Sequence, residues 1–300
     1  MSETVRPAAV RGALRPRRSV LYVPASNARA VEKARSLACD ALILDLEDAV
    51  APEMKPAARA AAVAAIDAGG FGRREVIVRV NALDTEWGAA DLAAVRGCGA
   101  DGVLVPKIRN EQDILDYQAK LHGAPAPLRL WAMIETARCV LRLDAIAAAS
   151  AKSRLSCFVL GTNDLAREMR VQLDHRRVPL CPILSLAVAA ARAYDLAILD
   201  GVYNAFDDDA GFAAQCGQGV EYGFDGKTLI HPRQVAPCNT AFSPTAESVD
   251  WARRVAAAFA EPGNANKGAV NLEGAMVERL HLTQAERILA VDAAVRDTAA

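Results

Sequence analysis

Leu130-Trp131-Ala132-Met133-Ile134-Glu135-Thr136-Ala137 is the stretch that decides how this chain folds. Its first five residues are apolar and predict a buried β-strand, the carboxylate of Glu135 follows directly, and a helix-like segment comes next. A continuous apolar strand followed by a helix is typical of a parallel α/β sheet. In an α/β barrel, active sites are built where the strands end, so Glu135 is the first candidate site residue.

The next apolar run, Leu155–Leu160, repeats this pattern and ends in a Gly-Thr-Asn-Asp-Leu segment that contains Asp164. Two successive strands therefore deliver Glu135 and Asp164 to the same end of the sheet. Two carboxylates brought together repel each other unless a cation lies between them, and Mg²⁺ with oxygen ligands is the obvious candidate. The alternative is that each carboxylate caps the helix that follows it, because carboxylates favour helix N-termini.

Eight such apolar runs alternate with helical segments, which predicts a closed (β/α)₈ or TIM barrel with a C-terminal helical extension. No G-x-G-x-x-G follows the first run and no P-loop is present, which argues against a dinucleotide-binding sheet. The expected strands cover residues 19–24, 40–46, 75–80, 101–106, 128–134, 155–160, 195–200 and 226–230.

The chain divides into three expected parts. Residues 1–18 form a basic N-terminal arm with five arginines and one glutamate, and residues 19–260 form the barrel. Residues 261–300 begin at a Pro- and Gly-containing hinge and form a C-terminal extension. We expect this extension to act as a lid or an oligomer contact, or else to be a helix packed on the surface.

Composition narrows the functional classes. The 300 residues include 35 basic and 36 acidic side chains, and this balance argues against binding to nucleic acid or to an anionic membrane. No apolar stretch is long enough to span a bilayer. The seven cysteines are scattered and form no C-x-x-C pair, which predicts a cytoplasmic protein without a disulfide framework or a zinc site.

Arg79 is the most informative cation because it lies in a strand after three apolar residues and must find an anion there. A planar guanidinium suits two-point binding of a carboxylate, so Arg79 is a candidate for substrate binding. The alternative is that it pairs with Glu47 or Asp48, which follow the preceding strand.

Other polar side chains are expected at the same mouth. Lys107 is a candidate Schiff-base lysine, although acidic neighbours would keep it charged and favour an electrostatic role. Lys227 is expected to be an ion-pair partner, and His231 a helix-capping or core histidine rather than a base. Asn81 and Asp200 complete this set, which as a whole can also be a ring of salt bridges that holds the rim.

Several strings, in this order, resemble the HpcH/HpaI aldolase and citrate lyase β-subunit family. They are RRSVLYVPASN (17–27), ALILDLEDAV (41–50), VIVRVNA (76–82), GVLVPK (102–107), MIETA (133–137), GTNDL (161–165), GKTLIHPRQV (226–235) and GAVNLEGAMVE (268–278).

The resemblance implies a Mg²⁺-dependent carbon–carbon lyase that cleaves or forms a 3-hydroxyacyl-CoA thioester, such as malyl-CoA or citramalyl-CoA, through an enolate. It implies that Glu135 and Asp164 bind the metal, that Glu135 and Arg79 contact the substrate, and that Glu47 and Asp48 hold metal-bound waters or orient Arg79. It also implies a homo-oligomer, either a trimer or a hexamer.

This sequence departs from the family pattern in two places. The turn after the first strand reads Val23-Pro24-Ala25 where the family has Gly, which predicts a less close approach of the backbone to CoA. In the C-terminal segment Glu278 stands where many members carry an Asp that serves a neighbouring subunit as acid or base. Glu278 can transfer the same proton, but its side chain is longer by one methylene.

Two other functions compete with the acyl-CoA lyase. One is an aldolase that acts on free 2-oxo acids, and the absence of any His among the first 120 residues counts against it. The other is a lyase or accessory subunit of a citrate lyase-like complex, which acts on a carrier-protein thioester.

Overall fold

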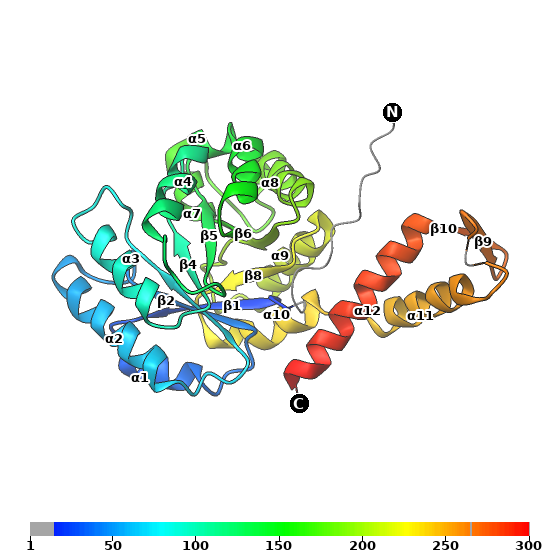
Figure 1. The fold of residues 1–300 in the computed structure, drawn as a ribbon, viewed down its shortest axis with the longest axis horizontal. Coiled ribbons are helices and arrows are strands. Elements are labelled where there is room, and N and C mark those ends of the chain that lie inside the picture. The colour runs from blue at the N-terminus through cyan, green and yellow to red at the C-terminus, as the bar shows by residue number, and fades with distance from the viewer. Residues whose placement is uncertain (1–14, 265, 300) are drawn as a thin grey trace. The chain divides into compact units, whose positions relative to one another are not determined.

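The computed structural model describes residues 15–264 and 266–299. Eight parallel strands pair in chain order and close into a barrel, because β1 pairs with both β2 and β8. This confirms the predicted TIM barrel (Figure 1). The strands are β1 (Ser19–Pro24), β2 (Ala41–Asp45), β3 (Glu75–Arg79), β4 (Gly102–Val105), β5 (Arg129–Ile134), β6 (Leu155–Leu160), β7 (Ala197–Asp200) and β8 (Gly226–Leu229).

Helices follow the strands and cover the outside of the barrel. Several of them begin at a polar residue whose side chain accepts a backbone N–H of the first turn, as Asn27, Asn110 and Asp208 do. The helices of the barrel are α1 (Ala28–Ala34), α2 (Lys55–Ala68), α3 (Gly88–Gly97), α4 (Glu111–Lys120), α5 (Ala137–Val140), α6 (Leu143–Ala148), α7 (Thr162–Met169), α8 (Cys181–Ala193), α9 (Asp209–Tyr222) and α10 (Val235–Phe242), with the 3₁₀ turns η1 (Pro52–Met54), η2 (Ala149–Lys152), η3 (Val178–Leu180) and η4 (Pro232–Gln234).

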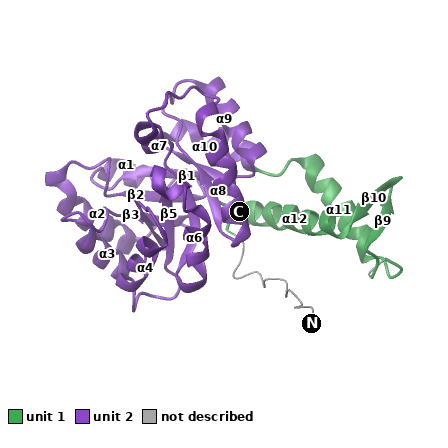
Figure 2. Ribbon diagram, turned by 90° about the horizontal axis from the view of Figure 1, so that it is seen from above, with its two compact units in different colours: residues 1–16, 243–300 green, residues 17–242 purple. Residues whose placement is uncertain are grey.

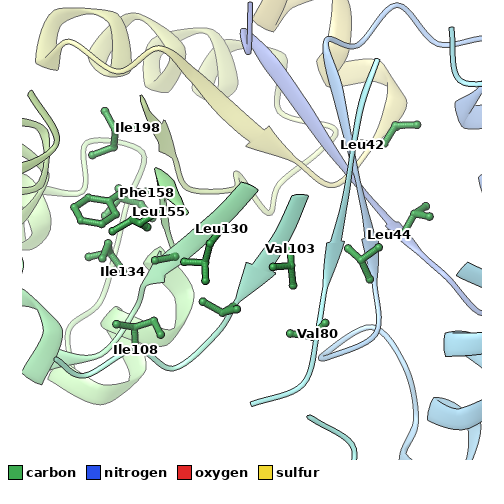
Figure 3. Packing of buried hydrophobic residues seen from close by; sticks show 14 of the residues in the cluster. Leu42, Leu44, Val80, Val103, Ile108, Leu130, Ile134, Leu155, Phe158 and Ile198 are labelled. Carbon is green, nitrogen blue, oxygen red and sulfur yellow. The ribbon is translucent and has the colours of Figure 1, made fainter. Parts of the chain in front are cut away.

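Successive residues of each strand face opposite sides of the barrel wall, and this alternation sorts the core into two layers. Ile43, Ile77 and Trp131 pack inside the barrel. Their neighbours Leu42 and Leu130 pack outside, between the strands and the helices (Figure 3). A strand residue therefore reaches the mouth only if it lies near the carboxyl end of its strand and its side chain faces the barrel interior.

The chain divides into two compact units, which Figure 2 colours separately. Residues 17–242 form the barrel unit, and the second unit contains, among the described residues, 243–264, 266–299 and the two residues Arg15 and Pro16. The sequence placed this boundary at residue 260. The difference arises because α11 (Ala246–Ala260) belongs with the C-terminal elements, where its Val255 and Phe259 share an apolar core with Val270 and Val277.

The C-terminal unit also contains an antiparallel hairpin and a long final helix. The hairpin pairs β9 (Ala269–Leu272) with β10 (Ala275–Glu278), and α12 (Arg279–Ala299) follows directly. Glu273 and Gly274 form its turn with positive φ angles of 53° and 89°, which glycine adopts readily. The sequence predicted a helical extension over residues 261–300, but not the hairpin.

Most of the predicted basic arm, residues 1–14, lies outside the described residues. Arg17 and Arg18 are held by the barrel: Arg17 pairs with Glu75 at 2.6 Å, and Arg18 pairs with Asp40 at 2.7 Å. Arg17 and Arg18 thus belong to the barrel rather than to the predicted arm, since they have buried carboxylate partners at the start of β3 and β2.

Within residues 15–264 and 266–299, no helix combines the length and the apolar character that a membrane span requires. The seven cysteines are free thiols, and six of them are buried.

Candidate active site

The inward-facing residues at the carboxyl ends of the strands surround a cavity of about 360 Å³. Tyr22 comes from β1, Asp45 from β2, Arg79 from β3 and Met133 from β5. Each lies two residues beyond an inward-facing residue of its strand and therefore faces the same way. Asp164 lies across the cavity, at the start of α7. The barrel thus brings both predicted groups, the cation Arg79 and a carboxylate of the expected metal site, to one pocket.

Arg79 binds a carboxylate at two points, but that carboxylate belongs to the protein. Its Nε lies 2.7 Å from Asp45 Oδ1 and its Nη2 lies 2.6 Å from Asp45 Oδ2. Nη1 lies 2.9 Å from Glu47 and 3.1 Å from Asp48. The expected contacts with Glu47 and Asp48 are therefore present, whereas sequence reasoning missed Asp45.

Lys107 links the remaining carboxylates of the mouth. Its Nζ lies 2.9 Å from Asp164, 3.3 Å from Glu135 and 3.9 Å from Glu47. Its backbone has a φ of 55°, and in that conformation its N–H donates to Glu135 Oε1 at 2.7 Å. Burial lowers the pKa of Lys107, but these carboxylates outweigh it and raise the pKa above its usual value. Lys107 is thus a charged group, as an electrostatic role requires.

Glu135 is buried and has one oxygen without a partner. Its Oε1 accepts the N–H of Lys107, while Oε2 has no hydrogen-bond partner among the described residues. Burial raises the pKa of Glu135 to about 7. Gly161 makes room for this side chain, because a Cβ there would lie 2.4 Å from the Cβ of Glu135.

Lys107 joins Glu135 and Asp164, because its Nζ lies 3.3 Å from Glu135 Oε1 and 2.9 Å from Asp164 Oδ2. Asp164 also pairs with the partly exposed Lys107 and with Arg167. Burial opposes ionisation of Asp164, but the hydrogen bond from Lys107 holds its pKa below the usual range. The two predicted metal ligands are therefore brought together.

The mouth as a whole fits a hard divalent cation. Its five carboxylates (Asp45, Glu47, Asp48, Glu135 and Asp164) outnumber its three cations (Arg79, Lys107 and Arg167). Within the described ranges, no group of three or more His, Cys, Asp or Glu side chains forms a preassembled metal cage. Mg²⁺ needs no such cage, because it commonly takes one or two carboxylates and completes its shell with water and substrate.

Asp200 and Lys227 do not reach the mouth, contrary to expectation. Leu199 faces the barrel interior, so Asp200 faces outward, and Lys227 likewise belongs to the outward set of β8. Both are fully buried and pair at 2.7 Å, and Arg177 pairs with Asp200 at 2.6 Å. Lys227 is thus an ion-pair partner, as expected, but in the wall of the barrel.

Asn81 and His231 also serve the fold. The side chain of Asn81, just after β3, accepts a hydrogen bond from Lys55 Nζ at 2.7 Å and donates one to Asp91 at 2.6 Å. His231 Nδ1 accepts the N–H of Arg233 at 3.2 Å and so caps the turn η4, and its ring stacks on Phe206. The predicted capping role of His231 is confirmed.

Glu278 lies at the end of β10 in the C-terminal unit, and its backbone N–H donates to His281 Nδ1 at 2.9 Å. That Glu278 acts as an acid or base at the site of a neighbouring subunit therefore stays a prediction.

The buried glutamates predict a pH dependence of stability in metal-free protein. Burial raises the pKa of Glu47 to about 8, although Arg79 and Lys107 oppose this, and Glu135 reaches about 7. In the unfolded chain both titrate near 4.5. The folded protein therefore holds protons that the unfolded chain has released, and these two groups make stability fall as pH rises from about 4.5 to about 8.

Thermal melts in EDTA across this interval test that prediction, with Glu47→Gln as the comparison. Because Gln stays neutral, the variant should lose less stability than wild type as pH rises. Parallel curves for the two proteins would contradict the raised pKa of Glu47.

The fold and this mouth define the chain as a (β/α)₈-barrel enzyme whose site combines a buried arginine with paired carboxylates. Residues 18–232 match the model of the HpcH/HpaI aldolase/citrate lyase family, and the chain belongs to this family. The family includes carbon–carbon lyases.

Known relatives cover almost the full length. The (3S)-malyl-CoA thioesterase of Cereibacter sphaeroides is 46% identical over 92% of this chain and 94% of its own. The citrate lyase subunit beta of Escherichia coli is 36% identical over 92% of this chain and 93% of its own. The crystal structure of CitE from Mycobacterium tuberculosis, in complex with magnesium, acetoacetate and coenzyme A, matches with a TM-score of 0.73 and 31% identity, and covers 93% of this chain and 98% of that one.

Proposed function

We propose that this protein is a Mg²⁺-dependent lyase that cleaves or forms the carbon–carbon bond of a malyl-CoA-type 3-hydroxyacyl thioester. The observation that carries the proposal is the free oxygen of buried Glu135 beside Asp164, in a mouth with more carboxyl groups than cationic side chains. The substrate class is supported by the malyl-CoA relative, and the metal by the solved relative that holds magnesium.

The residues of the mouth suit the charges that cleavage creates. A base removes the proton of the 3-hydroxyl, the bond between C2 and C3 breaks, and the products are a 2-oxo acid and the enolate of the shorter acyl-CoA, which then takes up a proton. Mg²⁺ bound by Glu135 and Asp164 would supply positive charge against the developing anion. Arg79 is held rigidly by Asp45, so its charge is already in place when the anion forms.

Thioester hydrolysis is a second candidate, because the 46% identical relative is named a malyl-CoA thioesterase. Hydrolysis would leave the malyl skeleton intact and release free CoA. In that reaction a carboxylate, for which Glu278 is our candidate, would activate water instead of the 3-hydroxyl.

We further propose that a second copy of the chain completes the site. In a homotrimer or hexamer, residues 261–300 would act as a lid and carry Glu278 to the mouth of a neighbouring barrel as the acid or base. A cytoplasmic location, where the seven free thiols stay reduced, belongs to the same proposal.

The test is turnover of (3S)-malyl-CoA and (3S)-citramalyl-CoA by the purified full chain, with Mg²⁺ and with EDTA. Mg²⁺-dependent release of glyoxylate or pyruvate without free thiol supports the lyase. Free thiol without an oxo acid supports the thioesterase. Cleavage of a free 4-hydroxy-2-oxo acid to an aldehyde and a 2-oxo acid would favour the aldolase on free 2-oxo acids. Turnover only of a carrier-protein thioester would favour the citrate lyase-like subunit. Either result contradicts the leading proposal.

A further inference from the structure

The inward-facing residue at the top of β1 is Tyr22, which lines the cavity. Its ring lies under the guanidinium of Arg79, with Arg79 Cζ 4.9 Å from the ring centroid. Such a cation–π contact fixes the plane of the guanidinium without using any of its N–H groups. Tyr22 therefore touches the cation that is best placed to receive the substrate.

Arg79 has little hydrogen-bonding capacity left for a substrate. It has five N–H donors. Among the described residues, Asp45 takes Nε and one N–H of Nη2, while Asp48 and the sulfur of Met133 take the two N–H groups of Nη1, which also lies 2.9 Å from Glu47 as an ion pair. One N–H of Nη2 remains, so Arg79 alone cannot bind a second carboxylate at two points.

The hydroxyl of Tyr22 can supply the missing donor. No hydrogen bond from it to another described residue is present, and its half-buried side chain borders the cavity. The charges of Arg79, Asp45, Glu135 and Glu47 all act on the phenol, which places it among these groups. Burial raises the pKa of Tyr22 well above its usual value, so the phenol keeps its proton at neutral pH and is available as a donor.

We propose that Tyr22 donates a hydrogen bond to the anionic end of the substrate, beside the remaining N–H of Arg79. This inference rests on the proposed function, because it takes the substrate to be a 3-hydroxyacyl thioester with a carboxylate. A further donor is needed at this place, since three carboxyl groups of the protein already contact Arg79.

Tyr22→Phe is the variant that tests the inference, because it keeps the ring under Arg79 and removes only the hydroxyl. A hydrogen bond to a charged acceptor is lost, so the KM for malyl-CoA should rise about 10- to 100-fold. The matched ligand is 3-hydroxybutyryl-CoA, which has a methyl group where malyl-CoA has its carboxylate. Its inhibition constant should stay unchanged in Tyr22→Phe.

Tyr194→Phe is the control variant, since its phenol bonds Asp144 at 2.9 Å on an exposed part of the surface. It should leave both constants at wild-type values. An unchanged KM for malyl-CoA in Tyr22→Phe would overturn the inference, and so would an equal weakening of both thioesters, which indicates a role in the fold alone.

Calorimetric titration with glyoxylate in the presence of Mg²⁺ separates this inference from the proposed function. If wild type turns over no thioester but binds glyoxylate, the proposed function fails, and about 10- to 100-fold weaker binding by Tyr22→Phe would still support the contact. If wild type binds glyoxylate and Tyr22→Phe binds it equally well, the contact is absent. If wild type neither turns over a thioester nor binds glyoxylate, both proposals fail.

Discussion

Glu135→Gln should abolish Mg²⁺ binding at the mouth and lower kcat/KM for the thioester by about 10³-fold or more. The substitution keeps the size of the side chain but removes its charge, so the oxygen that lacks a protein partner becomes part of a neutral amide. A Lewis acid beside a developing enolate contributes several kcal/mol, and each 1.36 kcal/mol is a factor of ten in rate. Asp164 alone would be left with Lys107 and Arg167 and would remain neutralised.

Calorimetric titration with Mg²⁺ measures the first effect and steady-state kinetics the second. Glu168→Gln is the control, because this exposed glutamate lies on the same helix as Asp164, one turn further along. It should behave as wild type in both measurements. Wild-type affinity for Mg²⁺ in Glu135→Gln would remove the metal site from Glu135, whatever the effect on turnover.

The barrel and the central part of its mouth were within reach of sequence reasoning. Parallel strands put their carboxyl ends at one rim, so Glu135, Asp164 and Arg79 could be placed together from their positions after or within apolar runs. Asp45 was missed because it is a single charge inside the apolar run ALILDL. A count by twos along β2, from Ala41 through Ile43, would have put Asp45 on the same side as the barrel interior.

The misplaced residues have a common physical cause. Asp200 ends β7 and Lys227 lies within β8, and each strand has only four residues, too few to show from sequence which set faces inward. Arg177, the second cation that pairs with Asp200, lies in the loop after α7, and nothing in its local sequence indicates a buried ion pair. The hairpin that carries Glu278 was also missed, since the turn Glu273-Gly274 requires positive φ angles that a Glu seldom adopts.

The second large prediction concerns the buried ion pairs of Asp200, which lie in the wall of the barrel rather than at its mouth. Asp200 neutralises Lys227 and Arg177, and Lys227 also donates to Gly201 O and Gln215 Oε1 at 2.5 and 2.7 Å. Removing one partner from a buried ion pair leaves an uncompensated charge and costs about 3–5 kcal/mol. Asp200→Asn leaves two buried cations without a carboxylate, so the cost should reach this range.

Differential scanning calorimetry of the full chain measures the effect as a fall of roughly 10 °C in the Tm of the barrel. Asp209→Asn is a matched control, since Asp209 pairs with Arg233 at 3.1 Å but three-quarters of its side chain is exposed. An exposed pair contributes about 0–1 kcal/mol, so this variant should melt within about 3 °C of wild type. Equal Tm values for the two variants would show that the buried pair does not hold the wall. A large fall in Tm for Asp200→Asn alone would show that the charge of Asp200 stabilises the wall by neutralising Lys227 and Arg177. This part of the wall adjoins the loop after β7, whose Val202 and Asn204 line the cavity.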